Sequence, residues 1–195
     1  MNYCEKDFIN QVRKMLSPRK RRVISHPPFS HAAVLVPLFQ KDGDCHLLFT
    51  KRSEEVKYHK GEISFPGGVV DEEDRELIHT ALREAHEEIG LKESDVQIIG
   101  VLDDIVTITE FIVTPIVGLF PYPYPFKVSQ AEIAELIEIP LASLIDENNF
   151  SEREIFRGGQ REIVFAYQYG DHVIWGATAR ILKQFLDLIT SPRKT

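Results

Sequence analysis

Three carboxylates fall on one turn of an expected helix. Glu84 and Glu88 lie four residues apart and therefore share a helix face, and Glu87 lies beside them. Their negative charges repel one another unless a positive group sits between them. A hard divalent cation such as Mg²⁺ suits this arrangement, because it prefers carboxylate and water oxygens as ligands. A solvated acidic helix face is the alternative interpretation of the same charge run.

A glycine loop precedes these glutamates. Gly67 and Gly68 follow Phe65-Pro66, and glycines let the backbone approach a ligand closely. Asp71 is the expected N-cap of a helix of about four to five turns, with acidic residues in its first turn. Gly90 ends that helix, because glycine suits the left-handed C-terminal position. The expected core-facing stripe is Ile78, Leu82, Ala85 and Ile89. The tight loop and the abrupt helix end favour the metal interpretation.

The run Arg83-Glu84-x-x-Glu87-Glu88-x-Gly90-Leu91 resembles the Nudix box. That family hydrolyses nucleoside diphosphates linked to another moiety, using Mg²⁺ or Mn²⁺ held by the box glutamates. Upstream the chain departs from the general box. Arg75 stands where the family's first box glutamate is expected, and Gly68 lies one residue farther from Arg83 than usual. The nearest acidic residues to the missing glutamate are Asp74 and Glu76.

A second motif precedes the box. It runs from Leu48 to Ser53 and continues through Lys57 and Gly61 to Phe65-Pro66-Gly67-Gly68. This run is similar to the signature of the coenzyme A pyrophosphatase branch of the Nudix family, which often has the longer box loop too. Lys57 replaces the usual arginine, which keeps the charge but loses the planar fork. The string from Ile174 to Leu182 also looks like that branch.

The resemblance implies a Nudix-type α/β/α sandwich with a mixed sheet, formed by residues 1–195 as one domain. It implies Glu84, Glu87 and Glu88 as metal ligands, all acting in catalysis. It also implies a small-molecule nucleoside diphosphate as the binding partner. The expected substrate-binding residues are Arg52, Lys57, Gly67 and Gly68. Among them Arg52 is favoured for phosphate, because a guanidinium can hold it by two hydrogen bonds.

Two further roles are assigned from the residues near the box. Arg83 is expected to be structural, pairing with Glu87 four residues on or with a nearby carbonyl. The general base is either a box glutamate or an acid from a later loop, and Glu132 is the candidate to test. The expected activity is metal-dependent hydrolysis of the diphosphate of coenzyme A or its derivatives. A Nudix enzyme for another substrate, such as ADP-ribose, and a non-catalytic Nudix-shaped binding module are the alternatives.

Composition excludes several classes of protein. The 195 residues are 43% hydrophobic, which suits one compact domain. The net charge of −7 argues against nucleic-acid binding, which needs a basic surface. The most apolar run, residues 111–120, is too short for a membrane span. Two cysteines suggest reduced thiols, and no signal peptide is evident, so a cytoplasmic location is expected. The sequence carries no signal for oligomeric state.

The remaining elements follow from periodicity and punctuation. A short amphipathic helix is expected over residues 5–16 and a terminal helix over 176–189. The expected strands are 31–40, 45–52, 96–102, 111–119, 133–139, 150–156, 162–169 and 173–175. Two segments have two interpretations each. The basic cluster 19–22 is either a solvated linker, which is favoured, or a phosphate contact. The aromatic segment 121–126 either packs as a surface connection or stacks on an adenine base.

Overall fold

The computed structural model describes residues 6–16, 19–25, 29–55, 59–157 and 159–190. Within these residues the helices are α1 (Lys6–Leu16), α2 (Leu77–Ile89), α3 (Leu141–Ile145) and α4 (Gly176–Thr190), with 3₁₀ helices η1 (Glu93–Asp95) and η2 (Glu147–Asn149). The strands are β1 (Ser30–Lys41), β2 (Asp44–Arg52), β3 (Ile63–Ser64), β4 (Gly67–Val69), β5 (Gln97–Val101), β6 (Ile105–Val106), β7 (Phe111–Leu119), β8 (Ile133–Pro140), β9 (Phe150–Arg157), β10 (Gln160–Tyr169) and β11 (His172–Trp175).

Strand β1 is the central strand of the large sheet. It pairs in parallel with β7 from Ser30↔Phe111 to Leu38↔Leu119 and antiparallel with β2 and β4. The strand order is β3-β2-β1-β7-β5. Strand β8 pairs with the edge of β2 opposite the one that pairs with β1 and β3. The sheet is therefore mixed, as expected. Both faces of β1 are buried, which explains its nearly continuous apolar sequence.

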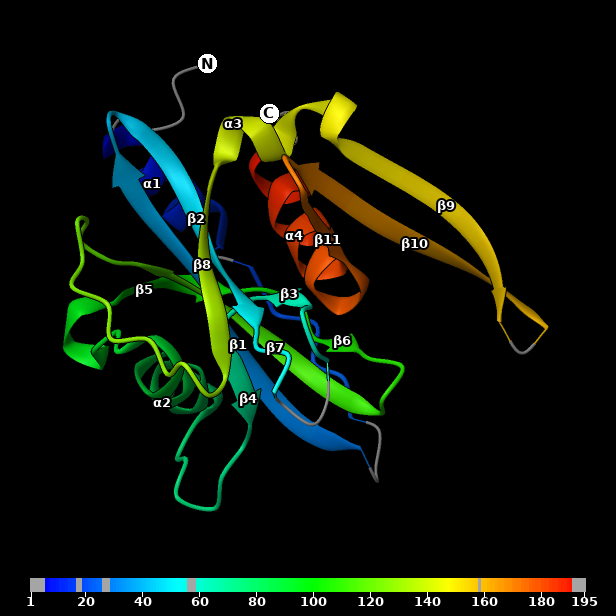
Figure 1. Cartoon of the computed structure of the whole chain (residues 1–195), viewed down its shortest axis with the longest axis horizontal. Helices are drawn as coiled ribbons and strands as arrows, with labels where there is room; N and C mark the ends of the chain where they lie inside the picture. Colours follow the sequence, from blue (N-terminus) through cyan, green and yellow to red (C-terminus); the bar gives the residue numbers. More distant parts are fainter. Residues whose placement is uncertain (1–5, 17–18, 26–28, 56–58, 158, 191–195) are drawn as a thin grey trace.

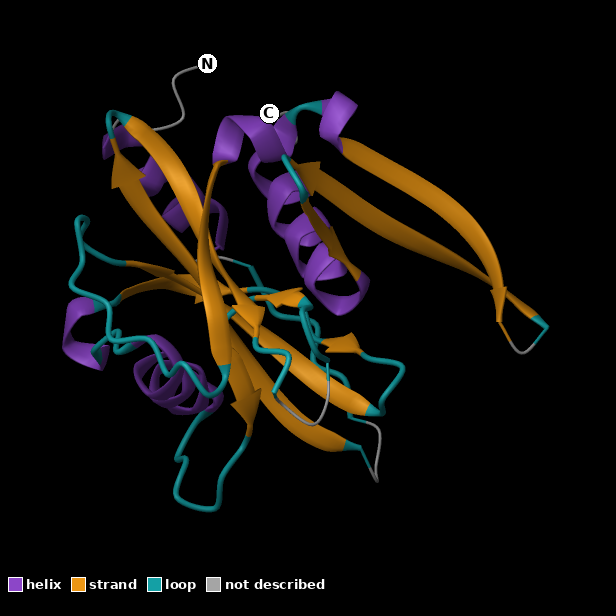
Figure 2. Cartoon of the chain, in the orientation of Figure 1, coloured by secondary structure: helices purple, strands orange, loops and turns teal. Residues whose placement is uncertain are grey.

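The two faces of this sheet pack against different helices. Odd-numbered residues of β1, such as Ala33 and Leu35, pack in a cluster with Ala85 and Ile89 of α2. Even-numbered residues, such as Val36, pack in a second cluster that includes side chains of α1 and α4. Figures 1 and 2 show α2 on one side of the sheet and α4 on the other. The expected α/β/α sandwich is confirmed.

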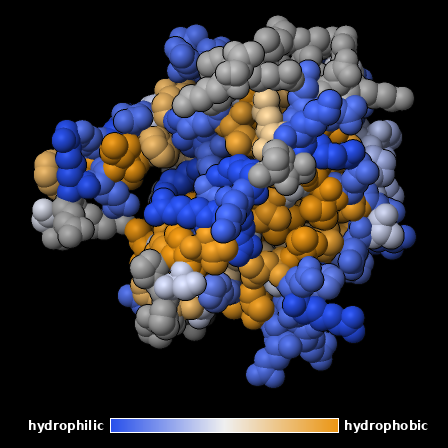
Figure 3. Space-filling model, turned by 180° about the vertical axis from the view of Figure 1, so that it is seen from behind, coloured by the Kyte–Doolittle hydropathy of each residue, from blue (hydrophilic) through white to orange (hydrophobic). Residues whose placement is uncertain are grey.

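Strands β9, β10 and β11 form a second, antiparallel sheet beside α4. The β9–β10 hairpin extends away from the body of the molecule, and Figure 3 shows the same projection from behind. Its base is packed, since Tyr167 is 2% exposed, whereas Phe156 farther along is 78% exposed. The burial of this hairpin therefore falls along its length.

The start of α2 differs from the prediction. The helix has 13 residues and begins at Leu77, with Glu76 at the N-cap position and no side-chain cap. Asp71 instead accepts a hydrogen bond from the backbone N–H of Glu73 at 3.1 Å, which closes a local turn. The expected end is confirmed, because Gly90 has φ 71° and ψ 17°. The acidic residues after Gly68 therefore belong to the loop and not to the helix.

Residues 19–22 and residues 121–126, which each had two interpretations, both contact the body of the protein. Arg19 pairs with Asp103, and the Nε of Arg21 lies 3.4 Å from Asp104. The basic cluster is thus anchored to the body by ion pairs. In the aromatic segment, Tyr122 stacks on Phe39 with ring centroids 4.7 Å apart and donates to Glu138. The packed-connection interpretation of residues 121–126 is therefore the one that the contacts favour.

Two other expectations concern the chain as a whole. Cys45 is buried and disulfide-bonded in the structure, so the expectation of two reduced thiols is wrong. Among the described helices, none combines the length and the apolar character needed to cross a membrane.

We predict that Asp104→Ala lowers the free energy of unfolding by about 3 kcal/mol, because it breaks a buried charged network. Asp104 is 5% exposed and accepts from Thr114 Oγ1 at 2.7 Å and from the Ile24 amide at 3.0 Å. Urea unfolding measures the loss. Asp171→Ala, at an exposed turn position, is the control and should change stability little. Equal effects of the two substitutions would contradict the assigned role of Asp104.

Candidate active site

Helix α2 presents its glutamates to three different environments. Its core stripe is buried at Leu82, Ala85 and Ile89, which fixes the rotation of the helix. Glu88 is consequently 3% exposed, and the Glu84 side chain is 18% exposed. The Glu87 side chain is 56% exposed and lies on the solvent side. The sequence placed these carboxylates on one turn correctly, but only Glu84 and Glu88 are turned inward.

The glycine loop lies directly against Glu84. Strand β4 pairs with β1 at Gly67↔Val34 and Gly68↔Ala33. A Cβ atom on Gly68 would lie 2.4 Å from Cδ of Glu84, and one on Gly67 would lie 2.4 Å from the carbonyl oxygen of Ala33. A side chain at residue 67 would clash with the backbone of β1, and one at residue 68 would push the Glu84 carboxyl group out of its present position. Gly67 and Gly68 therefore border the carboxylate cluster.

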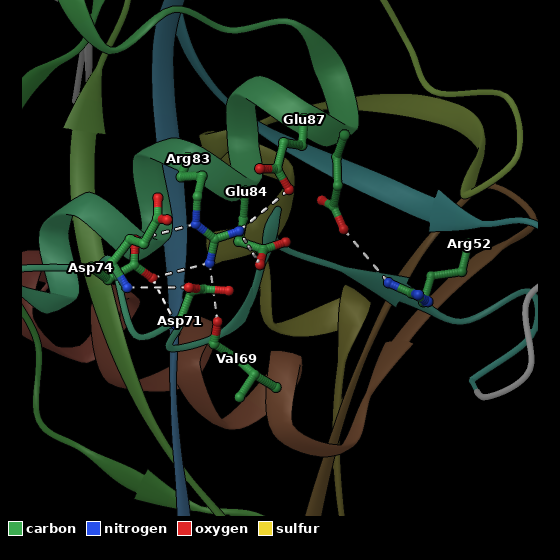
Figure 4. A network of polar contacts seen from close by, with 9 residues as sticks. Arg52, Val69, Asp71, Asp74, Arg83, Glu84 and Glu87 are labelled. Atoms are coloured by element: carbon green, nitrogen blue, oxygen red, sulfur yellow. Dashed lines mark hydrogen bonds and ion pairs between the residues drawn. The ribbon is translucent and has the colours of Figure 1, made fainter.

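Arg83 joins the loop to the glutamates, as Figure 4 shows. Its guanidinium donates two hydrogen bonds to Asp74, at 3.0 and 3.2 Å, and one to the carbonyl of Val69 at 3.1 Å. The same group donates to Glu84 at 2.8 Å and to Glu87 at 3.3 Å. The predicted pairing of Arg83 with Glu87 and with a nearby carbonyl is confirmed.

In the sequence, Asp74 is one of two acidic residues near the position where the Nudix box usually has its first glutamate. Its side chain is 5% exposed in the ion pair with Arg83. The hydrogen bonds from Arg83 lower the pKa of Asp74 from 3.8 to about 2, and the same bonds raise the pKa of Arg83. Asp74 therefore anchors Arg83. The sequence could not show that Asp74, and not Glu76, has this role, because both residues lie next to Arg75 at the expected glutamate position.

Glu88 occupies the least hydrated position of the cluster. Burial raises its pKa to about 8, against the opposing effect of the Arg52 charge. Arg52 Nη1 lies 3.5 Å from Glu88 Oε1. Oε2 of Glu88 and Nε of Arg52 are both buried and have no hydrogen-bond partner in the described structure. Arg52 thus contacts a box glutamate, a contact that the sequence did not predict.

Glu132 joins the cluster from another element. It directly precedes β8, and its carbonyl accepts from the backbone N–H of Ser53 at 2.7 Å. Its negative charge raises the pKa values of both Glu84 and Glu88, although burial is the largest cause for each. The structure therefore brings Glu132 near the two inward glutamates. Lys57 lies outside the described residues.

The donor set suits a hard divalent cation. Glu84 and Glu88 supply carboxylate oxygens, and Oε2 of Glu88 has no partner that an ion would have to displace. Among the described residues, no three acidic, His or Cys side chains are gathered as they stand into a metal site. Arg83 helps to keep the three glutamates apart, because it forms ion pairs with Glu84 and Glu87 and not with Glu88. An ion would therefore fit at Glu84 and Glu88 first, and Glu87 would have to leave Arg83 to join them.

A separate surface groove of about 740 Å³ lies on the other flank of α2. It is lined by Asp74, His79, Leu82, Arg83, His86, Lys92, Glu93 and Ser94. Neither Glu84 nor Glu88 lines it. The carboxylate cluster and this groove are therefore different surfaces that meet at Arg83.

Comparison with known proteins gives consistent matches. Residues 29–157 match the model of the NUDIX domain. An uncharacterized Nudix hydrolase NudL of Photorhabdus laumondii is 38% identical over 178 residues, covering 91% of this chain and 94% of the relative. A NudL protein of Escherichia coli is 34% identical over 91% of each chain.

Solved structures show the same fold. An Ap4A hydrolase of C. elegans has a TM-score of 0.50 at 20% identity, covering 60% of this chain and 83% of that one. A MutT/nudix family protein of Enterococcus faecalis has a TM-score of 0.51 at 14% identity, covering 96% of this chain and 72% of that one. The arrangement of sheet and helices is therefore shared well beyond close sequence relatives.

We predict that Asp74→Asn destabilises the protein at neutral pH by about 2 kcal/mol, the equivalent of the shift in pKa. The folded pKa of about 2 lies below the unfolded value of 3.8. The stabilisation is therefore complete well above 3.8 and is lost as pH falls through the interval between these values. Urea unfolding at several pH values should show the gap between wild type and variant closing in that interval. Exposed Glu73→Gln is the control, and a gap independent of pH would refute the assignment.

Proposed function

The chain belongs to the Nudix family, and from that premise we propose that it hydrolyses the diphosphate bond of coenzyme A or its derivatives with Mg²⁺ or Mn²⁺. Nudix hydrolases act on small nucleoside diphosphate substrates and generally use such ions. The products would be 3′,5′-adenosine bisphosphate and 4′-phosphopantetheine, or its acylated form. The observation that carries the proposal is the 3.5 Å contact between Arg52 of the upstream motif and Glu88 of the box. It joins the two motifs in one site.

Charge explains why this site suits a diphosphate. A diphosphate repels hydroxide, and negative charge develops on its non-bridging oxygens during hydrolysis. A bound divalent ion would neutralise that charge and lower the pKa of bound water. We assign Glu84 and Glu88 as the main ligands, because both are turned inward, and Glu87 as the ligand that completes the set. Gly67 and Gly68 let the loop lie directly against β1 and Glu84, and we assign them as the backbone that borders the substrate phosphates.

Two further residues have proposed roles at the reacting group. Glu132 is the proposed general base, because it lies near Glu84 and Glu88 yet remains exposed and able to exchange a proton with solvent. Arg52 is the proposed phosphate ligand of the substrate complex, where its guanidinium can donate two hydrogen bonds. Arg83 is assigned a positioning role, since its guanidinium already donates to Asp74, Glu84, Glu87 and Val69.

We predict that Glu84→Gln and Glu88→Gln each lower kcat by roughly 10² or more, by analogy with the loss of one positioned electrostatic group. Each change removes a ligand charge and keeps the side-chain volume. Steady-state hydrolysis at saturating Mg²⁺ measures the effect, and thermal unfolding checks the fold. Exposed Glu93→Gln in η1 is the control and should retain wild-type turnover. Unchanged turnover in either test variant would remove that residue from the ligand set.

We predict that coenzyme A is cleaved with a higher kcat/KM than dephospho-coenzyme A or ADP-ribose. The loop after Arg52 carries cations, including exposed Lys60, that could fix the 3′-phosphate which both competitors lack. Mass analysis of the products, followed by kinetics under one metal and ionic strength, makes the comparison. Equal or faster hydrolysis of ADP-ribose would assign a different nucleoside diphosphate to the site. Binding without hydrolysis of any of these substrates would indicate a non-catalytic module.

A further inference from the structure

Arg52 has two competing partners in the proposed site. Its guanidinium is the proposed ligand of a substrate phosphate, yet in the structure it contacts Glu88. The Glu88 side chain is 4% exposed and that of Arg52 is 26% exposed, so the contact is largely screened from solvent. One guanidinium in a single position cannot serve both a buried carboxylate and a phosphate fully. A phosphate that bound this guanidinium would therefore compete with Glu88 for it.

The backbone of Arg52 is held on both sides. Its N–H donates to the carbonyl of Glu62 at 3.0 Å, and its carbonyl accepts from Gly61 at 3.2 Å. The pairing of β2 with β8 shifts register between Lys51 and Arg52, but the extra residue lies on β8, so β2 itself keeps its alternation. Residue 48 of the same strand packs on the α2 side, and Arg52, which shares its parity, reaches Glu88 on that helix. Any exchange of partners must therefore come from rotation of the side chain.

The contact between Arg52 and Glu88 is incomplete on both sides. At 3.5 Å it is longer than a charge-assisted hydrogen bond and is not the paired fork that arginine and carboxylate can form. Nε of Arg52 and Oε2 of Glu88 are buried without a hydrogen-bond partner in the described structure. A buried polar group left unpaired is unfavourable, because it has lost its hydrogen bonds to water without gaining others. The carboxylate thus has capacity for a cation and the guanidinium has capacity for an anion.

The charges around Glu88 favour replacement of Arg52 by a divalent ion as its partner. Glu84 and Glu132 add negative charge, whereas the Arg52 guanidinium and the backbone N–H of Gly67 favour the charged form of Glu88. A divalent ion at Glu84 and Glu88 would supply twice the charge of Arg52 and repel it at short range. A substrate phosphate would then be the anion available to the displaced guanidinium.

We propose that Arg52 is a charge placeholder, which holds Glu88 while the divalent ion is absent and transfers to a substrate phosphate when the ion binds. This inference rests on the proposed metal-dependent function and adds a coupling between its two ligands. Because the ion releases Arg52 for phosphate, ion and substrate strengthen each other's binding, and the effect is reciprocal. Arg52 is the positioning residue that carries this coupling.

Calorimetric titration with Mg²⁺ alone tests the first half of the proposal. Wild type is compared with Arg52→Ala and with Arg52→Gln, which removes the charge but keeps an amide donor. The titrations are made at one pH and ionic strength in two buffers of different ionisation enthalpy, so that proton release on ion binding is measured for each variant. Both variants should bind Mg²⁺ about fivefold more tightly than wild type, at the lower end of usual coupling factors.

Lys51→Ala is the matched control. It removes one positive charge from the neighbouring residue, whose side chain lies on the opposite face of β2 by strand alternation. It therefore reproduces the change in net charge without touching Glu88 and should leave the Mg²⁺ affinity near that of wild type. An equal gain in Lys51→Ala would show that net charge, and not the Glu88 contact, sets the affinity. Unchanged or weaker Mg²⁺ binding in both Arg52 variants would overturn the placeholder role.

The second half uses α,β-methylene-ADP, a diphosphate that resists hydrolysis. Its dissociation constant is measured with and without saturating Mg²⁺, and the ratio gives the coupling factor. That factor should fall about fivefold in Arg52→Ala and be partly restored in Arg52→Lys, which keeps the charge without the fork. An unchanged factor would overturn the transfer to phosphate. Failure of wild type to bind Mg²⁺ would instead overturn the metal-dependent function itself, together with this inference.

Discussion

Repulsion among carboxylates gathered at one end of α2 is the interaction to which the rest of the site responds. Glu84 and Glu88 are turned toward the body of the protein, where burial raises the pKa values of both. Two arginines reduce the repulsion from opposite sides. Arg83 contacts Glu84 and Glu87 from the loop side, and Arg52 contacts Glu88 from the end of β2. Cations of the chain itself therefore offset the negative charges of the cluster.

The scaffold sets the distances that make this balance possible. Strand β1 pairs with β4 and also packs against α2, so it fixes the glycine loop and the glutamates relative to one another. The paired glycines let the loop lie against Glu84. Asp74, at the far end of the loop, then holds Arg83 in place through two hydrogen bonds. A short stretch of chain thus builds the site because each contact within it is anchored to a buried strand or helix.

Much of the fold could be predicted from sequence because it depends on periodicity. The strands near residues 30–52 and 111–119 and the helix ending at Gly90 followed from apolar runs, turn residues and a C-terminal glycine. The start of α2 could not be predicted, because Asp71 uses its carboxylate in a local turn instead of capping the helix. Short strands such as β6 carry too few residues for a period. The disulfide of Cys45 was missed because two cysteines define no framework in sequence.

The candidate site was predictable to the extent that its residues are close in sequence. The box spacing gave Glu84, Glu87 and Glu88, and the i+4 spacing gave the pairing of Arg83 with Glu87. The box spacing did not predict that Glu87 points outward, because the orientation of α2 about its axis is set by its buried residues. The contact of Arg52 with Glu88 joins residues far apart in the chain, so no local pattern could reveal it.

The contact between Gly68 and Glu84 also has an evolutionary consequence. A Cβ atom at position 68 would lie within 2.6 Å of all three atoms of the Glu84 carboxyl group. Every codon that replaces this glycine therefore intrudes on a carboxylate contributed by a different element of the chain. A larger residue at 68 would require a change at 84 or a rotation of the Glu84 carboxylate out of its ion pair with Arg83. The two positions are therefore expected to change together, although fifteen residues separate them in the chain.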